Sequence, residues 1–279
     1  MLEVTDYRRS LERSRMSRSR RDGRSTFRLQ QREWDLLEGV FAPTDSPSTG
    51  IALDLLGLSC GLPGTRTGSL LEIGCGAGVI AVAAALAGCE RVVASDINPA
   101  AVRNTDLNAA RHGVGDRVRS VQSDLFAALD PEERFDTIFW SSNYVMAPEG
   151  YHYEHVHERA YVDAGYRAHR RFLAEAPERL RPGGRVLLHF STRGDLVSLL
   201  RLAGQAGRGL RMLHGVVVRE GDHDVEHMLL EVTAFAPRED GVPQQREDSV
   251  PQQREGAAGA RCEVSVPRPR AAERERERL

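Results

Sequence analysis

Lysine is absent from this 279-residue chain, so all 38 of its basic residues are arginines. Such a bias reflects the coding sequence more than chemistry, and it carries little functional weight. Cysteine is scarce as well: the four cysteines stand at positions 60, 75, 89 and 262, with no Cys-x-x-Cys pair. Their spacing argues against both a zinc site and a disulfide framework, and it favours a reduced, cytoplasmic setting.

Long apolar runs are missing too. No stretch of roughly 18 apolar residues is present to span a bilayer, so no membrane partner is expected. Arg8-Arg9 and Arg20-Arg21 resemble a twin-arginine export signal, but a hydrophobic stretch follows neither pair. The hydrophobic fraction of 41% is nevertheless enough for a substantial core, which predicts one large α/β domain with appendages.

Composition divides the chain into three segments. Residues 1–33 are rich in arginine and serine with little apolar periodicity, which predicts a flexible basic arm. This arm is either a solvated leader or a contact for RNA or another polyanion. Residues 34–236 carry the periodic patterns of a folded domain. Residues 237–279, in which Val-Pro-Gln-Gln-Arg-Glu occurs twice, are predicted to be a disordered tail without a catalytic role.

A glycine turn at residues 74–78 is the centre of the sequence. Leu70-Leu71-Glu72-Ile73 has the composition of a buried strand, and glycines at 74, 76 and 78 let the backbone approach a ligand without a Cβ atom. An apolar, alanine-rich helix follows over 79–87. A strand, a glycine turn and a helix N-terminus in this order build a nucleotide-type pocket.

Strand and helix patterns alternate from Ser69 onward and predict a Rossmann-like, doubly wound, mostly parallel sheet of seven strands. The turn at 220–223 is too short for a crossover helix, so the last two strands should form an antiparallel hairpin. The earlier segment 34–58 ends in a helix over 48–56, capped by Ser48 or Thr49. This segment either packs beside the glycine turn and covers the cofactor, or packs as ordinary N-terminal structure. The strands are expected near 70–74, 91–96, 117–122, 135–140, 184–190, 210–219 and 226–235, and the helices near 78–88, 98–112, 160–180 and 194–206.

The spacing of the glycines favours S-adenosylmethionine over a dinucleotide. A dinucleotide turn needs Gly-x-Gly-x-x-Gly, and Val79 stands where its last glycine would be. Glu72, two residues before the turn, suits a ligand that carries an ammonium and a sulfonium group. Asp96 ends the second strand, where a carboxylate can accept hydrogen bonds from both ribose hydroxyls. Asp124 follows the third strand and can accept a hydrogen bond from the adenine amino group.

With these motifs, residues 35–236 resemble the class I S-adenosylmethionine-dependent methyltransferases. Asp96-Ile97-Asn98-Pro99-Ala100-Ala101-Val102, together with Asn108, is similar to the HemK-related and small-domain group, which modifies planar nitrogens of protein glutamine or of RNA bases. The resemblance implies a seven-stranded sheet ending in the antiparallel hairpin. It also implies cofactor contacts by Glu72, Gly74, Gly76, Asp96 and Asp124, and we include their neighbours Cys75, Gly78, Ile97 and Leu125 in the expected site.

The acceptor motif departs from this group. The HemK-like Asn-Pro-Pro-Tyr holds the target NH2 through its Asn, whereas this chain has Ser141-Ser142-Asn143-Tyr144. Ser141 therefore takes the place of the Asn, Asn143 falls on the second proline, and Tyr144 matches. Either Asn143 substitutes through a two-residue bulge, or the acceptor is an amine or hydroxyl with different partners. Trp140 and Tyr144 either flank the sulfonium or a planar acceptor, or pack in the core and rim.

Three of the nine histidines lie between Tyr151 and Glu158. This segment is expected to cover the acceptor pocket as a polar lid, with His152 or His155 as a general base, and the alternative is a solvated loop. No metal site is expected, because the His-Glu-x-x-His arrangement is absent. His189, inside a strand, is interpreted as a satisfied interior histidine.

The favoured function is methyl transfer from S-adenosylmethionine to a small-molecule or peptide-like acceptor, at nitrogen. One alternative is an RNA or protein N-methyltransferase that uses the basic arm as an anchor for nucleic acid or protein. Another is a non-catalytic binding protein with a methyltransferase fold, which the departure at Ser141 favours. The sequence gives no indication of the oligomeric state.

Overall fold

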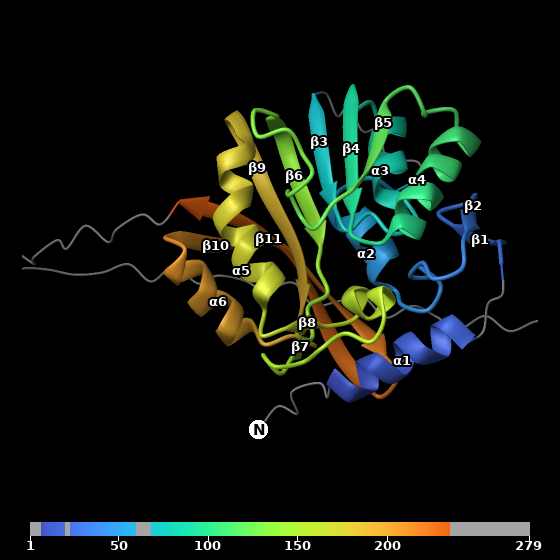
Figure 1. Ribbon diagram of the computed structural model, residues 1–279. Coiled ribbons are helices and arrows are strands. Elements are labelled where there is room, and N and C mark those ends of the chain that lie inside the picture. Colours follow the sequence, from blue (N-terminus) through green and yellow to red (C-terminus); the bar gives the residue numbers. More distant parts are fainter. Residues whose placement is uncertain (1–6, 20–22, 60–67, 235–279) are drawn as a thin grey trace, which may run out of the picture. The chain divides into compact units, whose positions relative to one another are not determined.

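The protein is described by a computed structural model that covers residues 7–19, 23–59 and 68–234 (Figure 1). Its centre is a seven-stranded sheet in the order β10-β11-β9-β6-β3-β4-β5. The four parallel pairs are β3–β4, β3–β6, β4–β5 and β6–β9, while β9–β11 and β10–β11 are antiparallel. The strands are β3 (Ser69–Ile73), β4 (Arg91–Asp96), β5 (Val118–Gln122), β6 (Phe135–Ser141), β9 (Leu180–Ser191), β10 (Arg208–Glu220) and β11 (His223–Ala234).

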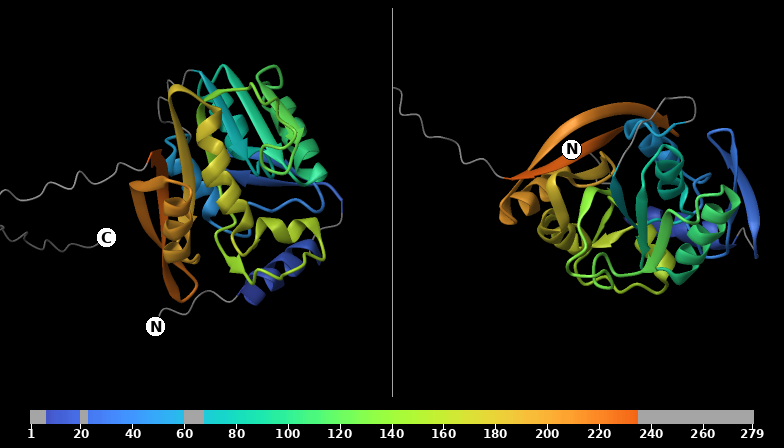
Figure 2. Two further views of the ribbon diagram at one scale, coloured as in Figure 1. Left: turned by 60° about the vertical axis from the view of Figure 1, so that its left-hand side comes forward. Right: turned by 90° about the horizontal axis from the view of Figure 1, so that it is seen from above.

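The predicted fold class is therefore confirmed, together with all seven expected strands and the closing hairpin. Every residue of β3 is buried, as expected for a parallel strand that is covered on both faces. Helices cover both faces of the sheet (Figure 2). One apolar cluster includes side chains of α2 (Ser48–Leu55), α3 (Val79–Leu86) and α4 (Pro99–Arg111). The other includes side chains of α5 (Arg167–Glu175) and α6 (Leu196–Gln205).

The glycine turn brings α3 close to α4. Gly78 has φ of 79° and precedes α3, and a Cβ atom there would lie 2.8 Å from both Cα and Oγ1 of Thr105 on α4. No side chain fits in that space, so Gly78 is required for packing between the two helices. This contact fixes the position of the turn relative to the rest of the domain.

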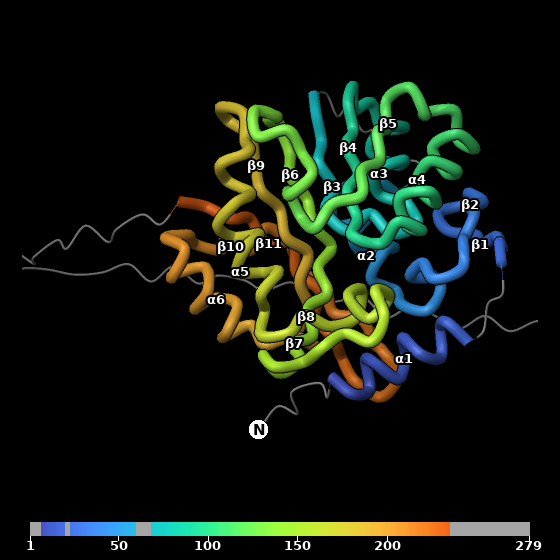
Figure 3. The backbone as a smooth tube through the Cα atoms, in the orientation of Figure 1, coloured from blue at the N-terminus to red at the C-terminus, as the bar shows by residue number. Residues whose placement is uncertain are grey.

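The N-terminal segment differs from the flexible arm expected for residues 1–33. Residues Tyr7–Ser19 form α1, and β1 (Ser25–Leu29) pairs with β2 (Arg32–Leu36) as an antiparallel hairpin. The hairpin packs on α4, whereas α1 packs near the short strands β7 (Met146–Ala147) and β8 (Asp163–Ala164) (Figure 3). The buried side of α1 consists of one leucine and three serines, so it gave no apolar periodicity: Ser10, Leu11, Ser14 and Ser17.

The helix expected over 160–180 is shorter and begins later. The Asp163 carboxylate accepts hydrogen bonds from the backbone N–H groups of Ala168 and His169, which caps α5 after a turn at Gly165 and Tyr166. The 3-10 turn η2 (Ala176–Arg179) then leads directly into β9. At α2 the predicted cap is wrong: the preceding residue is Pro47, and no side chain caps the helix.

Several expectations fall on residues outside the described ranges, namely the tail at 237–279, the first six residues of the arm, and Cys60 and Cys262. Among the helices that the structure describes, none has both the length and the apolar character that a bilayer span requires.

Candidate active site

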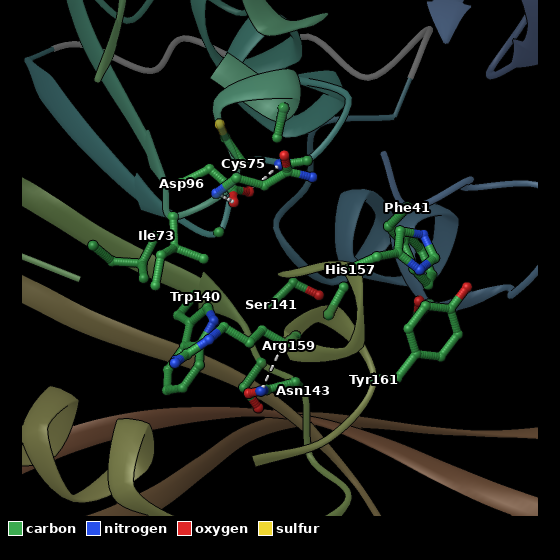
Figure 4. A pocket seen from close by; sticks show the side chains of 18 of the residues that line it. Phe41, Ile73, Cys75, Asp96, Trp140, Ser141, Asn143, His157, Arg159 and Tyr161 are labelled. Carbon is green, nitrogen blue, oxygen red and sulfur yellow. Dashed lines mark hydrogen bonds between the residues drawn. The ribbon is translucent and has the colours of Figure 1, made fainter. Parts of the chain in front are cut away.

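A cavity of about 900 Å³ opens at the carboxyl ends of β3, β4 and β6. Cys75 of the glycine turn and Asp96 lie on one side, and His157 and Arg159 of the 3-10 turn η1 (Val156–Ala160) lie across from them (Figure 4). Residues of α1 also line the cavity. Of the residues expected to bind cofactor, Gly78 does not line the cavity. The other eight do: Glu72, Gly74, Cys75, Gly76, Asp96, Ile97, Asp124 and Leu125.

Asp96 is held rigidly at the end of β4. Its Oδ2 accepts a hydrogen bond from the Gly76 N–H at 2.9 Å, and its Oδ1 accepts one from the Asn98 N–H at 2.8 Å. Burial raises the pKa of this carboxyl, and the backbone donors oppose that shift. Because a carboxylate can accept about four hydrogen bonds and three backbone N–H groups, of Gly76, Ile97 and Asn98, approach Asp96, it retains acceptor capacity for a ligand hydroxyl.

Glu72 is a buried carboxylate with unused hydrogen-bonding capacity. Its side chain is 2% exposed, and its Oε2 has no hydrogen-bond partner among the described residues. Burial raises its pKa well above the usual range, and the nearby charge of Asp96 adds to the shift. Because an unpaired buried polar atom is costly, a cationic or N–H donor in the cavity would stabilise this residue.

Asp124 has a partner that the sequence did not reveal. Its Oδ1 forms an ion pair with the Arg171 guanidinium of α5 at 2.9 Å, and both side chains are partly exposed. The two residues are 47 positions apart in the chain, so their pairing depends on the packing of α5 against the sheet. Asp124 lines the cavity, and its expected adenine contact remains a prediction.

Asn143 lines the opposite end of the cavity. Its Nδ2 donates to the carbonyl oxygens of Arg159 at 2.8 Å and Val162 at 2.9 Å. These two acceptors fix which end of the amide is nitrogen. Its Oδ1 is buried and has no partner among the residues that the structure describes. Asn143 therefore retains an unused carbonyl.

Ser141 and Tyr144 also line this end of the cavity. The Ser141 Oγ lies 3.0 Å from the His189 Nδ1. The Tyr144 ring meets His227 edge-on, with 6.2 Å between centroids, and burial raises the pKa of its hydroxyl. Trp140 both lines the cavity and packs on the Phe172 ring at 5.1 Å.

The structure does not bring His152 or His155 to the cavity. His152 is exposed, and the His155 side chain accepts a hydrogen bond from the backbone N–H of His157, which caps η1. His157 lines the cavity instead, and its Nδ1 lies 2.8 Å from the Ser14 Oγ of α1. Burial lowers the pKa of His157 to about 4, so it is neutral near pH 7.

Sequence reasoning missed the cavity residues of α1, whereas Phe41 lies in the segment 34–58 that was expected beside the glycine turn. Phe41 and Tyr161 pair across the cavity wall, with ring centroids 5.3 Å apart. The one signal for α1 is the helical spacing of its small residues at positions 10, 14 and 17. No group of three His, Cys, Asp or Glu side chains that could hold a metal occurs within the described ranges. Other cavity residues that the sequence did not indicate include Arg13, Met16, Ser17, Arg159 and Arg167.

Comparison with known proteins agrees with this geometry. Residues 47–142 match the family model described as ribosomal protein L11 methyltransferase (PrmA). The ribosomal protein L11 methyltransferase of Tolumonas auensis is 33% identical over 109 residues, which are 39% of this chain and 34% of that protein. The release factor glutamine methyltransferase of Bordetella pertussis is 32% identical over 153 residues, covering 51% of this chain and 56% of that protein.

The fold also matches a solved structure. The 16S rRNA methyltransferase of T. thermophilus, solved with AdoMet and guanosine, aligns with a TM-score of 0.53 and 21% identity, over 77% of this chain and 51% of that one. The described residues form a class I S-adenosylmethionine-dependent methyltransferase domain. The chain spans between a third and just over half of the length of the two curated relatives above.

S-adenosylmethionine is the cofactor of this class, and the methyltransferase domain has side chains that fit it. Glu72 has the unpaired buried oxygen that an ammonium group would satisfy. Asp96 has acceptor capacity for a ribose hydroxyl, and the glycine turn leaves space for the ligand.

Proposed function

We propose that this protein transfers the methyl group of S-adenosylmethionine to a nitrogen of a small or peptide-like acceptor. The proposal rests on one observation: a single cavity contains both a cofactor end and an acceptor end. Glu72 and Asp96 lie at the cofactor end, and Ser141 and the unpaired Asn143 carbonyl lie at the other end. A cavity of about 900 Å³ is near the upper limit for a single drug-sized ligand, so it leaves room for a second molecule.

The proposed chemistry is an in-line displacement. When bound, the cofactor supplies an electrophilic methyl group on a sulfonium. The chain's own task is to hold the acceptor nitrogen on the far side of that methyl group, with reacting atoms roughly 3–3.5 Å apart. An NH2 group that donates one N–H to Asn143 and the other to Ser141 has its lone pair free for this attack. Two acceptor oxygens therefore favour nitrogen over a hydroxyl oxygen, which has a single proton.

Charge on the cavity wall supports an acceptor that carries an acidic group. Arg13, Arg159 and Arg167 line the cavity, and none of the three forms an ion pair with a described residue. Arg159 lies over the Tyr153 ring at 4.4 Å, which holds its guanidinium in place. A carboxylate on a small or peptide-like acceptor would pair with one of these guanidinium groups.

Protein acceptors are the second candidate. The two curated relatives are named as methyltransferases of ribosomal protein L11 and of release factor glutamine. A glutamine side chain also presents an NH2 group that two oxygens could hold. In this case one residue of a larger substrate would enter the cavity beside α1 and η1.

The first experiment is titration calorimetry of the full chain with S-adenosylmethionine and, separately, with NAD. Binding of S-adenosylmethionine alone is expected, and binding of NAD alone would contradict the proposal. Labelled methyl donor is then incubated with amino acids and short peptides, with ribosomal and release factor proteins, and with RNA. Label in the first pool supports the first candidate, and label in the second pool supports the protein candidate. Label in RNA alone, or in none of the pools, counts against both.

A further inference from the structure

A chain of hydrogen bonds runs from the cavity into the antiparallel part of the sheet. Ser141 Oγ lies 3.0 Å from His189 Nδ1, and His189 Nε2 lies 3.0 Å from His227 Nδ1. His227 Nε2 lies 2.8 Å from Glu220 Oε1. These four residues belong to β6, β9, β11 and β10, which are successive neighbours in the sheet (Figure 1). The chain is therefore built by strand pairing.

Burial isolates the middle of this chain from solvent. Both histidines are 0% exposed, and the Glu220 side chain is 8% exposed. Arg193 forms an ion pair with the other Glu220 oxygen at 2.5 Å. Burial alone would raise the pKa of Glu220, but its hydrogen bond from His227 and the charge of Arg193 give a net decrease. Glu220 is therefore ionised and accepts hydrogen bonds only.

The ionised carboxylate sets the direction of the bond from His227, and with a neutral His227 it sets the direction of the whole chain. His227 must donate from Nε2 to Glu220, so a neutral His227 accepts at Nδ1. His189 then donates from Nε2 and accepts at Nδ1. Burial and the neighbouring His227 lower the pKa of His189 to about 3, which keeps it neutral. The Ser141 hydroxyl consequently donates to His189, and its lone pairs remain available to the cavity.

We propose that His189, His227 and Glu220 form a proton relay that holds Ser141 as a hydrogen-bond acceptor and removes the proton of the methylated nitrogen. This inference rests on the proposed nitrogen methylation. Ser141 touches the acceptor and is the catalytic residue, while the other three are positioning residues that act through it. The relay gives Ser141 the acceptor role that an Asn carbonyl would otherwise supply.

The relay accounts for every proton that moves during the methyl transfer. The bond between the methyl carbon and nitrogen forms as the carbon–sulfur bond breaks, and its electron pair stays on sulfur. The acceptor nitrogen loses a proton to Ser141 Oγ, and the Ser141 proton moves to His189 Nδ1. The Nε2 proton of His189 moves to His227 Nδ1, and the Nε2 proton of His227 moves to Glu220. Glu220 ends neutral, and both histidines end as Nδ1–H tautomers. Release of the Glu220 proton to solvent near the exposed hairpin turn at 221–222, with return of both histidines to the Nε2–H form, restores the relay for the next turnover.

The direction of the bonds can be measured without knowledge of the acceptor. Two-bond ¹H–¹⁵N correlation spectra of the ¹⁵N-labelled full chain distinguish Nδ1–H, Nε2–H and doubly protonated histidines. We expect His189 and His227 to be neutral Nε2–H tautomers at pH 7.5. An Nδ1–H or doubly protonated form of either residue would overturn the relay. This result stands even if methyl transfer to nitrogen is not found.

Kinetics tests the relay itself. In Glu220→Gln the amide can still accept from His227, but it has no charge to take up a proton. We expect kcat to fall by about 100-fold or more with the cofactor Kd unchanged, as for loss of general base assistance. Asp222→Asn is the matched control, because it removes the same charge from the exposed turn two residues away. Equal kcat values for Glu220→Gln and wild type would overturn the relay.

The last test measures the energetic coupling between Ser141 and Glu220 in a double variant. If Ser141 and Glu220 act as one unit, Ser141→Ala combined with Glu220→Gln is no slower than Ser141→Ala alone. The pH dependence of kcat should weaken in Glu220→Gln and persist in Asp222→Asn. The charged and titratable groups around Glu220 are Arg193, His227 and Tyr144, with Arg13 acting on Tyr144. Multiplicative rate losses in the double variant would contradict a relay.

Discussion

Asn108 of α4 holds the backbone of Asp35 in β2. Its Oδ1 accepts a hydrogen bond from the Asp35 N–H at 2.7 Å. Its Nδ2 donates to the carbonyl oxygen of Ala77 in the glycine turn at 2.8 Å, so a single buried amide connects the N-terminal hairpin to the cofactor end of the cavity. Asn104, one turn earlier, holds the Leu37 N–H at 2.7 Å in the same way.

Substitution of Asn108 by alanine should therefore destabilise the domain and weaken cofactor binding together. The change leaves buried backbone groups of Asp35 and Ala77 without their partner, at a cost of roughly 1–3 kcal/mol for each unsatisfied group. Urea unfolding should show a lower midpoint, and calorimetry a higher Kd for S-adenosylmethionine. Arg103→Ala, at an exposed position of the same helix, is the control and should change stability by less than about 0.5 kcal/mol. Equal midpoints for the two variants would contradict this account.

Substitutions at the two ends of the cavity should affect different constants, the cofactor Kd at one end and kcat at the other. Asp96→Ala removes a buried carboxylate that orders the glycine turn, so we expect the cofactor Kd to rise by about 10-fold or more. Asn143→Ala removes the unpaired carbonyl at the acceptor end, so kcat should fall about 10-fold or more with the cofactor Kd nearly unchanged. Val217→Ala, on the exposed side of β10, is the control. Similar cofactor-binding losses in both variants would defeat this division of roles.

Strands β3 and β4 could be predicted because parallel strands buried on both faces appear as short apolar runs, and Glu72, Gly74 and Asp96 stand near their ends. The closing hairpin could be predicted from the short turn at 220–223. The covering elements could not be predicted in this way. The buried side of α1 is mostly serine, and Ser14 meets His157 across 143 positions of sequence. Neither residue type nor spacing predicts the contact between Ser14 and His157, because it depends on the folded positions of the strands and loops.

The acceptor end shows the same limit more sharply. From the sequence, Ser141 is interpreted as the loss of the Asn that holds the target NH2, and His189 is interpreted as a satisfied interior histidine. His189 and His227 are 38 positions apart, and the register of β9 against β11 brings their rings together. The sequence predicted the hairpin between β10 and β11 only as a pairing, and it predicted no register for β9 against β11.

Acid should destabilise the protein through His157. Burial lowers its pKa to about 4 in the folded state, whereas an unfolded chain has the ordinary value of about 6.5. Between these values the unfolded state binds more protons, so the free energy of unfolding is fully retained above about pH 6.5. It falls as the pH drops toward 4, by at most about 1.4 kcal/mol per pH unit.

Unfolding midpoints from pH 4 to 7.5 should accordingly show a shallower slope in His157→Gln than in wild type. His189, whose pKa is lowered to about 3, contributes with the same sign in both proteins. His152→Gln alters an exposed histidine of the same segment and should keep the wild-type slope. A slope unchanged by His157→Gln would exclude this residue as the origin of the acid sensitivity.

Docking of α1 should protect its arginines from trypsin. Leu11 is 5% exposed and packs with Val145, Ala147, Tyr161 and Val162, so Leu11→Ala should cost about 2–4 kcal/mol of that docking. We expect faster tryptic cleavage within residues 7–19 in Leu11→Ala and slower cleavage in wild type with S-adenosylmethionine bound. Glu12→Ala, at the next and exposed position of α1, should be cleaved at the wild-type rate. Rapid cleavage of α1 in the wild type would show that it does not hold its place over the cavity.

The arginines on the cavity wall predict how the enzyme ranks acceptors. Arg13 projects from α1 into the cavity lining without an ion-pair partner among the described residues, so Arg13→Gln should raise the KM for an acceptor that carries a carboxylate. The KM for the corresponding amide and the cofactor Kd should stay within about 2-fold. Arg9→Gln removes the same charge from an exposed position of α1 and should leave all three constants unchanged. If Arg13→Gln raised the cofactor Kd instead, its guanidinium would belong to the cofactor end of the cavity, and the acceptor would not need an acidic group.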